Sequence, residues 1–150
     1  MKINLNYTLI IACICSVLPL AAQNATGTWK TVDDRDGTTK AIIVIHEEDG
    51  RLYGHVKEIL EKGNEKALCT ECDGELKNKP VTGMRIINGL KQEGDGVWEG
   101  GKKSLFDPEQ GRYFRAKIWL DPHNPNKLKV RGYLLFLFRT QTWLRITDPS

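Results

Sequence analysis

The side chains whose types and spacing could bind a ligand lie near the end of the chain. Arg131 and Tyr133 stand two residues apart, so a β-strand would present both on one face. Arg139, Gln141 and Trp143 have the same spacing and could lie beside them. A guanidinium binds a carboxylate through two parallel N–H groups. If this face lines a cavity, it predicts a site for an anionic or amphipathic ligand; if it meets solvent, it makes ordinary cross-strand pairs.

Cys69 and Cys72 are the second pair with potential chemistry. A redox-active pair at this spacing needs a helix N-terminus that lowers the thiol pKa, and the flanking sequence indicates none. Zinc would need two further ligands, and nothing in the sequence ties His46 or His55 to the cysteines. We therefore favour a disulfide that constrains a local loop, and we expect no metal and no cofactor.

Residues for acid–base or nucleophilic catalysis do not form a recognisable set. Asp33, Asp34 and Asp36 cluster around one turn, and Asp107 precedes a proline, as turn-forming aspartates commonly do. The sequence contains neither Gly-x-Ser-x-Gly nor a phosphate-binding loop. We therefore expect binding rather than catalysis, with an enzyme of unrecognised site as the least favoured alternative.

The N-terminus has the pattern of a secretory signal. Lys2 supplies a positive charge, residues 9–18 form an apolar stretch, and small residues end at Ala22, where we expect cleavage. The stretch is shorter than the roughly 20 residues that span a bilayer. The protein is therefore expected in the periplasm or outside the cell, with lipidation at Cys13 as a minor alternative. Residues 23–150 are expected to form one domain.

The net charge and the expected export of the protein limit the classes of molecule that it could bind. Removal of Lys2 with the signal leaves 21 basic and 19 acidic side chains, a net charge of +2. So small a charge favours neither nucleic acid nor a membrane surface as an obligatory partner, and no stable membrane span is expected. In an exported protein a pair of cysteines is typical of a disulfide. The remaining partners are a small amphipathic ligand and a protein of the cell envelope.

Short β-type segments separated by turn signals, spaced by about 8–12 residues, dominate the mature chain. The clearest hairpin joins residues 42–47 to 52–56 through Asp49-Gly50, the preferred pair for a type I′ turn. Eight or nine such strands predict an all-β, antiparallel up-and-down barrel, because closure removes exposed strand edges. The one long connection is Glu61–Thr82, which contains both cysteines. Asp121–Asn126, rich in proline and asparagine, is expected to be a loop.

The last three expected strands, residues 112–120, 127–135 and 139–146, alternate in polarity. We predict that they share one apolar face, which includes Thr140, Thr142 and Leu144, and one basic-aromatic face. The simplest interpretation puts the apolar face inside and the basic-aromatic face in solvent. The apolar run Leu134–Phe138 is interpreted as a buried strand, with a lip at a ligand entrance or a contact patch as alternatives.

Short segments spread over the mature chain resemble a bacterial family. They are Gly27-Thr28-Trp29, Asn78-Lys79-Pro80 with Gly83, Trp98–Lys102, Asp107-Pro108 with Gly111, Lys129–Tyr133 and Arg139–Trp143. In this order they resemble the domain-of-unknown-function family 2147 (DUF2147). The resemblance implies a secreted or periplasmic protein without an assigned activity. The sequence departs from the pattern where Phe138 replaces an expected glycine, which leaves the last hairpin turn undefined.

A second likeness is architectural. Gly27-x-Trp29 on the first strand, with an arginine on the last, is similar to the lipocalin-like pattern, in which the tryptophan closes one barrel end and the arginine packs on it. Arg145 or Arg139 could take this role. Arg131-x-Tyr133 is similar to the carboxylate-binding pair of intracellular lipid-binding barrels. We therefore expect a lipocalin-like barrel that binds a small apolar or amphipathic anionic ligand. The alternative is an envelope interaction module that uses the Cys69–Cys72 loop or the basic-aromatic face.

Overall fold

The computed structural model describes residues 24–147. The expected signal segment, residues 1–22, lies outside this range. The described residues form antiparallel strands and one short 3₁₀ helix. They are β1 (Gly27–Val32), β2 (Thr39–Glu48), β3 (Arg51–Ile59), η1 (Gly74–Leu76), β4 (Arg85–Gly94), β5 (Val97–Glu99), β6 (Leu105–Asp107), β7 (Arg112–Asp121), β8 (Asn124–Leu134) and β9 (Leu137–Arg145). Within residues 24–147, no helix has the length and apolar character needed to cross a membrane.

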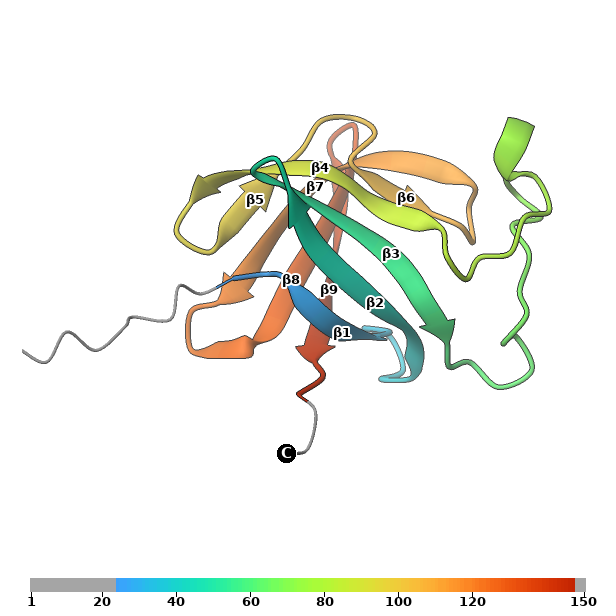
Figure 1. The fold of residues 1–150 in the computed structure, drawn as a ribbon, viewed down its shortest axis with the longest axis horizontal. Coiled ribbons are helices and arrows are strands. Elements are labelled where there is room, and N and C mark those ends of the chain that lie inside the picture. The colour runs from blue at the N-terminus through green and yellow to red at the C-terminus, as the bar shows by residue number, and fades with distance from the viewer. Residues whose placement is uncertain (1–23, 148–150) are drawn as a thin grey trace, which may run out of the picture.

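The strands close into a barrel (Figure 1). β1 pairs with both β2 and β9, and β3 pairs with β4, so the sheet of the described residues returns to its start. The short strands β5 and β6 both pair with β4 and with β7, and together they fill one position. The barrel therefore has eight strand positions, and the ninth strand is extra because β5 and β6 share one position. This closed barrel confirms the predicted all-β antiparallel barrel.

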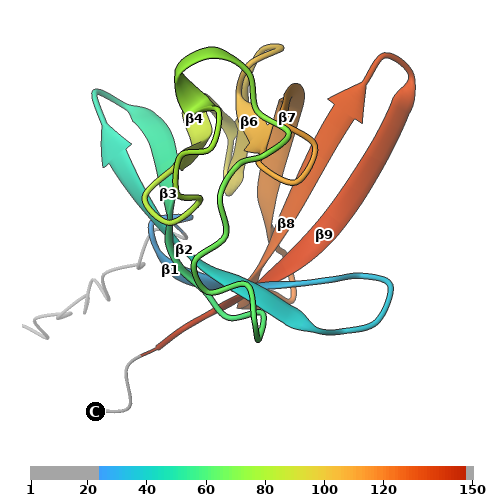
Figure 2. The ribbon, with the colours of Figure 1, turned by 90° about the vertical axis from the view of Figure 1, so that its right-hand side faces the viewer.

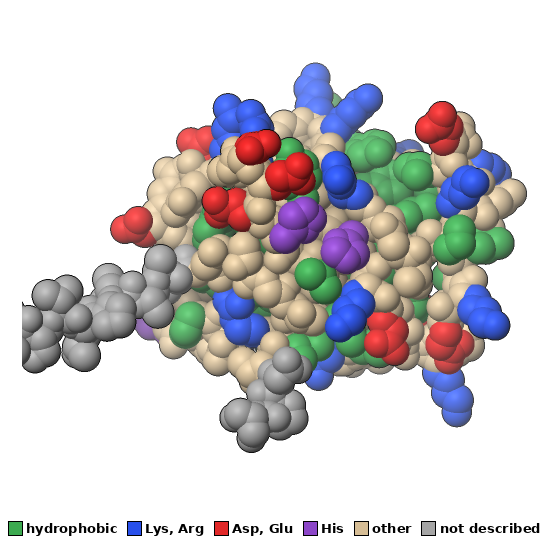
Figure 3. Space-filling model, in the orientation of Figure 1, with side chains coloured by type: hydrophobic (Ala, Val, Ile, Leu, Met, Phe, Trp, Pro, Cys, Tyr) green, Lys and Arg blue, Asp and Glu red, His purple; other side chains and the backbone are tan. Residues whose placement is uncertain are grey.

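The β2–β3 hairpin has the predicted register. Glu48 lies opposite Arg51, and Asp49 and Gly50 have φ angles of 50° and 72°, as a type I′ turn requires. His46 and His55 are diagonal neighbours, with ring centroids 6.2 Å apart. Both lie on the outer surface of the hairpin, where Figure 3 shows histidine side chains next to each other.

Large side chains fill one half of the barrel. Because every second residue of a strand points inward, strands from all around the barrel contribute to this core. Its buried members are Trp29, Ile45, Leu52, Leu90, Trp98, Ile118 and Leu128. None of these seven side chains lines the cavity of the barrel, and their burial helps to hold the barrel closed.

Arg145 covers Trp29 at the outer end of the filled half. The two residues are directly opposite each other on β9 and β1, and the guanidinium carbon lies 4.2 Å from the indole ring centre. The guanidinium also donates hydrogen bonds to the carbonyl oxygens of Thr26 and Asn24, at 2.8 and 2.7 Å. A side chain at Gly27 would place its Cβ 3.0 Å from Arg145 Nη1. Thus Arg145, and not Arg139, stacks on the tryptophan.

The β8–β9 hairpin differs from the prediction. Leu134 pairs with Leu137, so Leu135-Phe136 is a two-residue turn. In this register Val130 lies opposite Gln141, and the predicted grouping of Thr140 and Thr142 with the apolar face is therefore wrong. A shift of one residue moves every side chain of a strand to the other face.

Two further expectations near these strands are wrong. Leu134–Phe138 is not a buried strand but an exposed hairpin tip, with Leu135 89% and Phe136 87% exposed. Asp121–Asn126 is not a loop throughout, because Asp121 pairs with Asn124 and β8 begins there. Pro125 is tolerated because it lies near the start of the strand, where the missing N–H interrupts little of the ladder.

Candidate functional site

The second half of the barrel is hollow. It contains a cavity of about 730 Å³, within the range of small-molecule sites. The cavity wall is mainly apolar, with Trp143 nearest the filled half on β9. Other apolar residues of the wall are Ala41, Ile43, Val56, Ile86, Phe114 and Val130. The structure therefore provides an apolar chamber above a packed core.

Four connections surround the mouth of the cavity. They are the β1–β2 turn (residues 33–38), the long loop between β3 and β4 (60–84), the β6–β7 turn (108–111) and the β8–β9 turn (135–136). Figure 2 views this end, with the long loop in front and the β8–β9 hairpin to its side. Residues from the first three connections line the cavity, together with the flanks of the β8–β9 turn.

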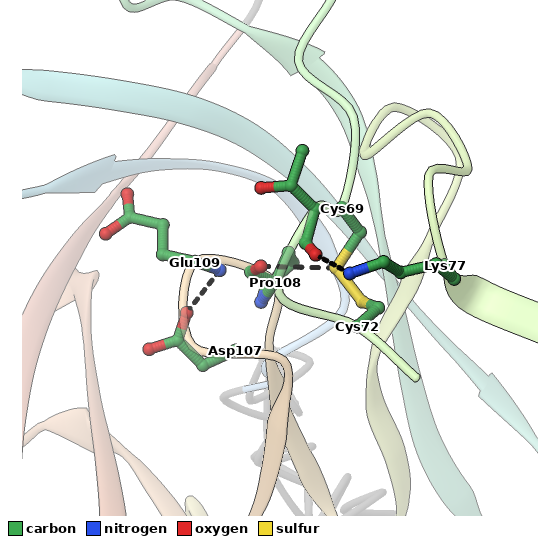
Figure 4. The surroundings of a disulfide bond; sticks show 7 residues. Cys69, Cys72, Lys77, Asp107, Pro108 and Glu109 are labelled. Atoms are coloured by element: carbon green, nitrogen blue, oxygen red, sulfur yellow. Dashed lines mark hydrogen bonds between the residues drawn. A yellow bond between two sulfur atoms is a disulfide. The ribbon is translucent and has the colours of Figure 1, made fainter. Parts of the chain in front are cut away.

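A disulfide shapes the long loop. Cys69 and Cys72 are bonded, with Cα atoms 5.3 Å apart, and both are buried. Lys77 Nζ donates to the carbonyl oxygen of Thr70. Cys69 Sγ lies 3.2 Å from the Pro108 carbonyl oxygen (Figure 4). The disulfide that the sequence predicted is confirmed, and it faces the β6–β7 turn rather than solvent.

The loop fits tightly onto the β6–β7 turn. Gly111 has a φ of 61°, and a Cβ added there would lie 1.9 Å from the carbonyl oxygen of Glu71. Only glycine combines this backbone conformation with such a close approach. The long loop therefore packs closely against the β6–β7 turn at the cavity mouth.

A buried carboxylate organises the opposite side of the mouth. Asp33 is 4% exposed and accepts hydrogen bonds from Arg35 Nε and Nη2, at 3.0 and 2.8 Å. Lys40 Nζ and Arg139 Nη2 each lie 3.6 Å from an Asp33 oxygen. The hydrogen bonds from the Arg35 side chain and backbone hold the pKa of Asp33 well below its usual range. The carboxylate is therefore charged and holds three cations.

Two of these cations have further acidic partners. Arg139 donates to the Asp34 carboxylate, and this hydrogen bond lowers the pKa of Asp34. Lys40 Nζ lies 3.2 Å from Glu109 Oε1 on the β6–β7 turn. The mouth thus carries a nearly balanced set of charges above the apolar chamber.

Gln141 supplies a polar group inside the chamber. It lies between Arg139 and Trp143 on the inward face of β9, and its Oε1 accepts a hydrogen bond from Trp143 Nε1 at 3.3 Å. Within residues 24–147, no protein group accepts a hydrogen bond from Gln141 Nε2. This amide is free to donate to a bound molecule.

The structure divides the candidate ligand-binding residues. Arg139, Gln141 and Trp143 line the cavity. Arg131 and Tyr133 point to the outside of the barrel, where Arg131 Nε donates to Thr140 Oγ1 at 2.6 Å. The five residues therefore do not form one site.

Sequence reasoning missed part of the mouth. Asp33 was interpreted as a turn former, which it is, since its carboxylate also accepts the Arg35 backbone N–H. Lys40 and Glu109 were not singled out, and no spacing in the sequence connects them. Only the closure of the barrel brings these residues together.

The comparisons with known proteins agree with this architecture. The family model described as uncharacterized protein conserved in bacteria (DUF2147) matches residues 27–145. A solved structure of protein HP1028 from the human pathogen Helicobacter pylori, described as belonging to the lipocalin family, is similar, with a TM-score of 0.70. The two sequences are 16% identical, and the similarity covers 83% of this chain and 84% of that one. At this identity the likeness concerns the fold alone. Among functionally curated proteins, none matches this sequence.

The family model begins at the first residue of β1 and ends at the last residue of β9. The match therefore covers every strand of the barrel, the residues that line the cavity and the four connections at the cavity mouth. The chain belongs to the DUF2147 family of bacterial proteins and has a lipocalin-like barrel fold.

Proposed function

We propose that this protein is an exported carrier that binds a small, mainly apolar or amphipathic ligand in the hollow half of its barrel and does not transform it. The observation that supports this proposal is the cavity of about 730 Å³ with an apolar wall and a polar mouth. Small barrels are commonly filled by their own side chains, and this one is filled only around Trp29.

The lining indicates how a ligand would lie. Its apolar body would pack against residues such as Ile43, Phe114 and Val130, and its polar end would meet Arg139 and Gln141. Arg139 already pairs with Asp34. An anionic group would therefore have to compete with that carboxylate, whereas a neutral polar group could accept a hydrogen bond from Gln141 without displacing it. The proposed ligand class therefore includes both anionic and neutral polar molecules.

The first experiment is native mass spectrometry of the mature protein, purified from the periplasm without refolding, beside a denatured control. A mass excess that disappears on denaturation supports the proposal and gives the mass of the ligand. Folded, abundant protein without any excess contradicts a tightly bound natural ligand.

A second experiment tests the cavity directly with cis-parinaric acid, a fluorescent fatty acid. The double substitution Ala41→Phe/Val130→Phe adds bulk to the chamber wall and should reduce binding at least about tenfold, because the probe loses the volume it needs. Thr142→Val, on the outward face of β9, is the matched control and should bind as the unmodified protein does. Equal binding by the filled variant, with thermal stability retained, would place the probe outside the barrel.

A further inference from the structure

The tip of the β8–β9 hairpin exposes a continuous apolar surface. We call Leu134–Phe138 the apolar tip. Its members are exposed to 40% (Leu134), 89% (Leu135), 87% (Phe136), 63% (Leu137) and 61% (Phe138). Single exposed apolar residues are common, but five in sequence at the end of a projecting hairpin are typical of a contact surface.

The turn is also unfavourable for the isolated protein. Leu135 has a φ of 57°, a left-handed conformation that suits glycine or asparagine. The side chain is almost wholly exposed and gains no packing in return for this strain. Strained residues without internal contacts point to a role outside the folded core.

A set of cations and aromatic rings lies beside the apolar tip on the outer face of β7 and β8. We call Arg115, Trp119, Lys129, Arg131 and Tyr133 the basic-aromatic belt. Arg115 lies over the Tyr133 ring at 4.3 Å, and Arg131 lies over the Trp119 ring at 5.0 Å. The ring of Phe138, within the tip, is 4.4 Å from the Arg131 guanidinium. The tip and the belt are therefore one continuous surface.

The cations of the belt have no acidic partners in the part of the chain that the structure describes. Lys117 on the same strand pairs with Glu99 at 2.8 Å, but Arg115, Lys129 and Arg131 form no ion pair within residues 24–147. Their hydrogen-bond partners are the Thr140 and Thr142 hydroxyls, which bind Arg131 and Lys129. The belt is therefore a local excess of positive charge that the nearly neutral composition of the chain conceals.

We propose that the apolar tip and the basic-aromatic belt dock the protein on an anionic lipid surface. Exposed leucine and phenylalanine side chains enter the acyl region, the cations meet lipid phosphates, and tyrosine and tryptophan prefer the depth between them. The prediction that a membrane surface is not an obligatory partner used only the net charge of the chain. Binding to a lipid surface depends instead on how the charged side chains are distributed over the protein surface. The proposal does not depend on ligand binding in the cavity.

The position of the apolar tip determines how the barrel would be oriented on the lipid surface. Leu134, Leu137 and Phe138 belong to the tip and also line the cavity. A hairpin inserted in lipid would therefore hold the cavity mouth at the membrane surface, where an apolar molecule can pass between the bilayer and the barrel without crossing water.

The test is flotation of the mature protein with vesicles of equal parts phosphatidylglycerol and phosphatidylcholine, compared with phosphatidylcholine alone. We expect binding to the anionic vesicles that falls as salt rises from about 0.1 M to about 1 M. The double substitution Leu135→Asn/Phe136→Ser should reduce the partition coefficient at least about tenfold. Its melting temperature should be unchanged or higher, because asparagine tolerates the left-handed turn, so lost binding cannot be attributed to unfolding.

A charge-matched pair of variants tests the belt. Arg115→Gln/Arg131→Gln should weaken binding to the anionic vesicles at least several-fold. Lys57→Gln/Lys91→Gln removes the same charge from exposed positions on β3 and β4 and should bind as the unmodified protein does. The proposal is overturned if the unmodified protein does not float with anionic vesicles or if the tip variant floats equally well. It is also overturned if the tip only joins two copies of the chain, seen as a dimer that the tip variant converts to a monomer without any vesicle binding.

Discussion

Asp34 and Arg139, which are 105 residues apart in the chain, form an ion pair that joins the β1–β2 turn to the first residues of β9. The Arg139 guanidinium also approaches the buried Asp33 carboxylate to 3.6 Å. A basic side chain can therefore face the barrel interior, because two carboxylates at the cavity mouth neutralise it. This pair lies where the polar end of a ligand would enter.

The Asp34–Arg139 pair should control the preference for anionic ligands. Asp34→Asn frees the guanidinium and should tighten binding of cis-parinaric acid by about two- to fivefold, the size of a partly exposed ion pair. Arg139→Gln should weaken it by a similar factor. Fluorescence titration of both variants with the acid and with its methyl ester measures this. If acid and ester respond equally in both variants, Arg139 does not contact the head group.

Arg145 should contribute to the free energy of unfolding and not to ligand binding. Arg145→Ala removes the stacking on Trp29 and leaves the carbonyl groups of Asn24 and Thr26 without their donor. We expect the free energy of unfolding in urea to fall by about 2–4 kcal/mol. Arg131→Ala, on the outer wall, should lower it by less than about 1 kcal/mol. Equal losses in the two variants would show that the stacked pair does not hold the barrel end closed.

Gly111 should be essential for the fit of the long loop. Gly111→Ala would place a Cβ 1.9 Å from the Glu71 carbonyl oxygen, in a backbone conformation that alanine avoids. We expect the free energy of unfolding to fall by about 2–4 kcal/mol and proteolysis within residues 61–82 to become faster. Gly101→Ala is the matched control, because nothing lies within 4 Å of the added carbon and its φ is not positive. A Gly111→Ala protein as stable as this control would mean that the loop can move away freely.

The buried Asp33 carboxylate should make the protein sensitive to acid. Its pKa in the folded protein lies well below the ordinary value of 3.8, because Arg35 donates hydrogen bonds to the charged form. The unfolded chain therefore binds a proton first as the pH falls. The stabilisation is complete above the unfolded value and is lost progressively below about pH 4.

Melting temperatures measured from about pH 7 to about pH 2.5 test this dependence. Asp33→Asn should melt lower than the unmodified protein at neutral pH, since the carboxylate no longer holds Arg35. Its melting temperature should then decline less over the acid range, so that the two curves converge. Two parallel curves would contradict a role for Asp33 in acid unfolding.

The sequence predicts the parts of the fold that depend on local chemistry. Asp49-Gly50 specifies a type I′ turn, and this turn sets the register of β2 against β3 down to the contact between His46 and Tyr53. The alternation of β7 and β8 likewise indicates which side chains point inward. The closed antiparallel barrel follows from many short strands joined by tight turns.

The face of β9 could not be predicted in the same way. Leu134–Phe138 contains no turn-forming residue, so the position of the chain reversal was undefined. The alternation in polarity then led to the wrong inward face, because Thr140 and Thr142 are less polar than Arg139 and Gln141. Arg139 and Gln141 point inward because the two-residue turn sets the register of β9 against β8. Arg139 is then paired with Asp34, a contact that forms only in the folded barrel.

The division of the barrel into a packed half around Trp29 and a hollow half below its mouth also concerns how this fold can change over evolutionary time. Substitutions at positions such as Ala41, Val130 and Gly132 alter the shape of the chamber while leaving the core that closes the barrel intact. Under the proposed carrier function, a few changes near the mouth would therefore alter which ligand the chamber accepts. For protein engineering, the same separation allows substitutions that reshape the chamber to be made without changing the packed side chains around Trp29.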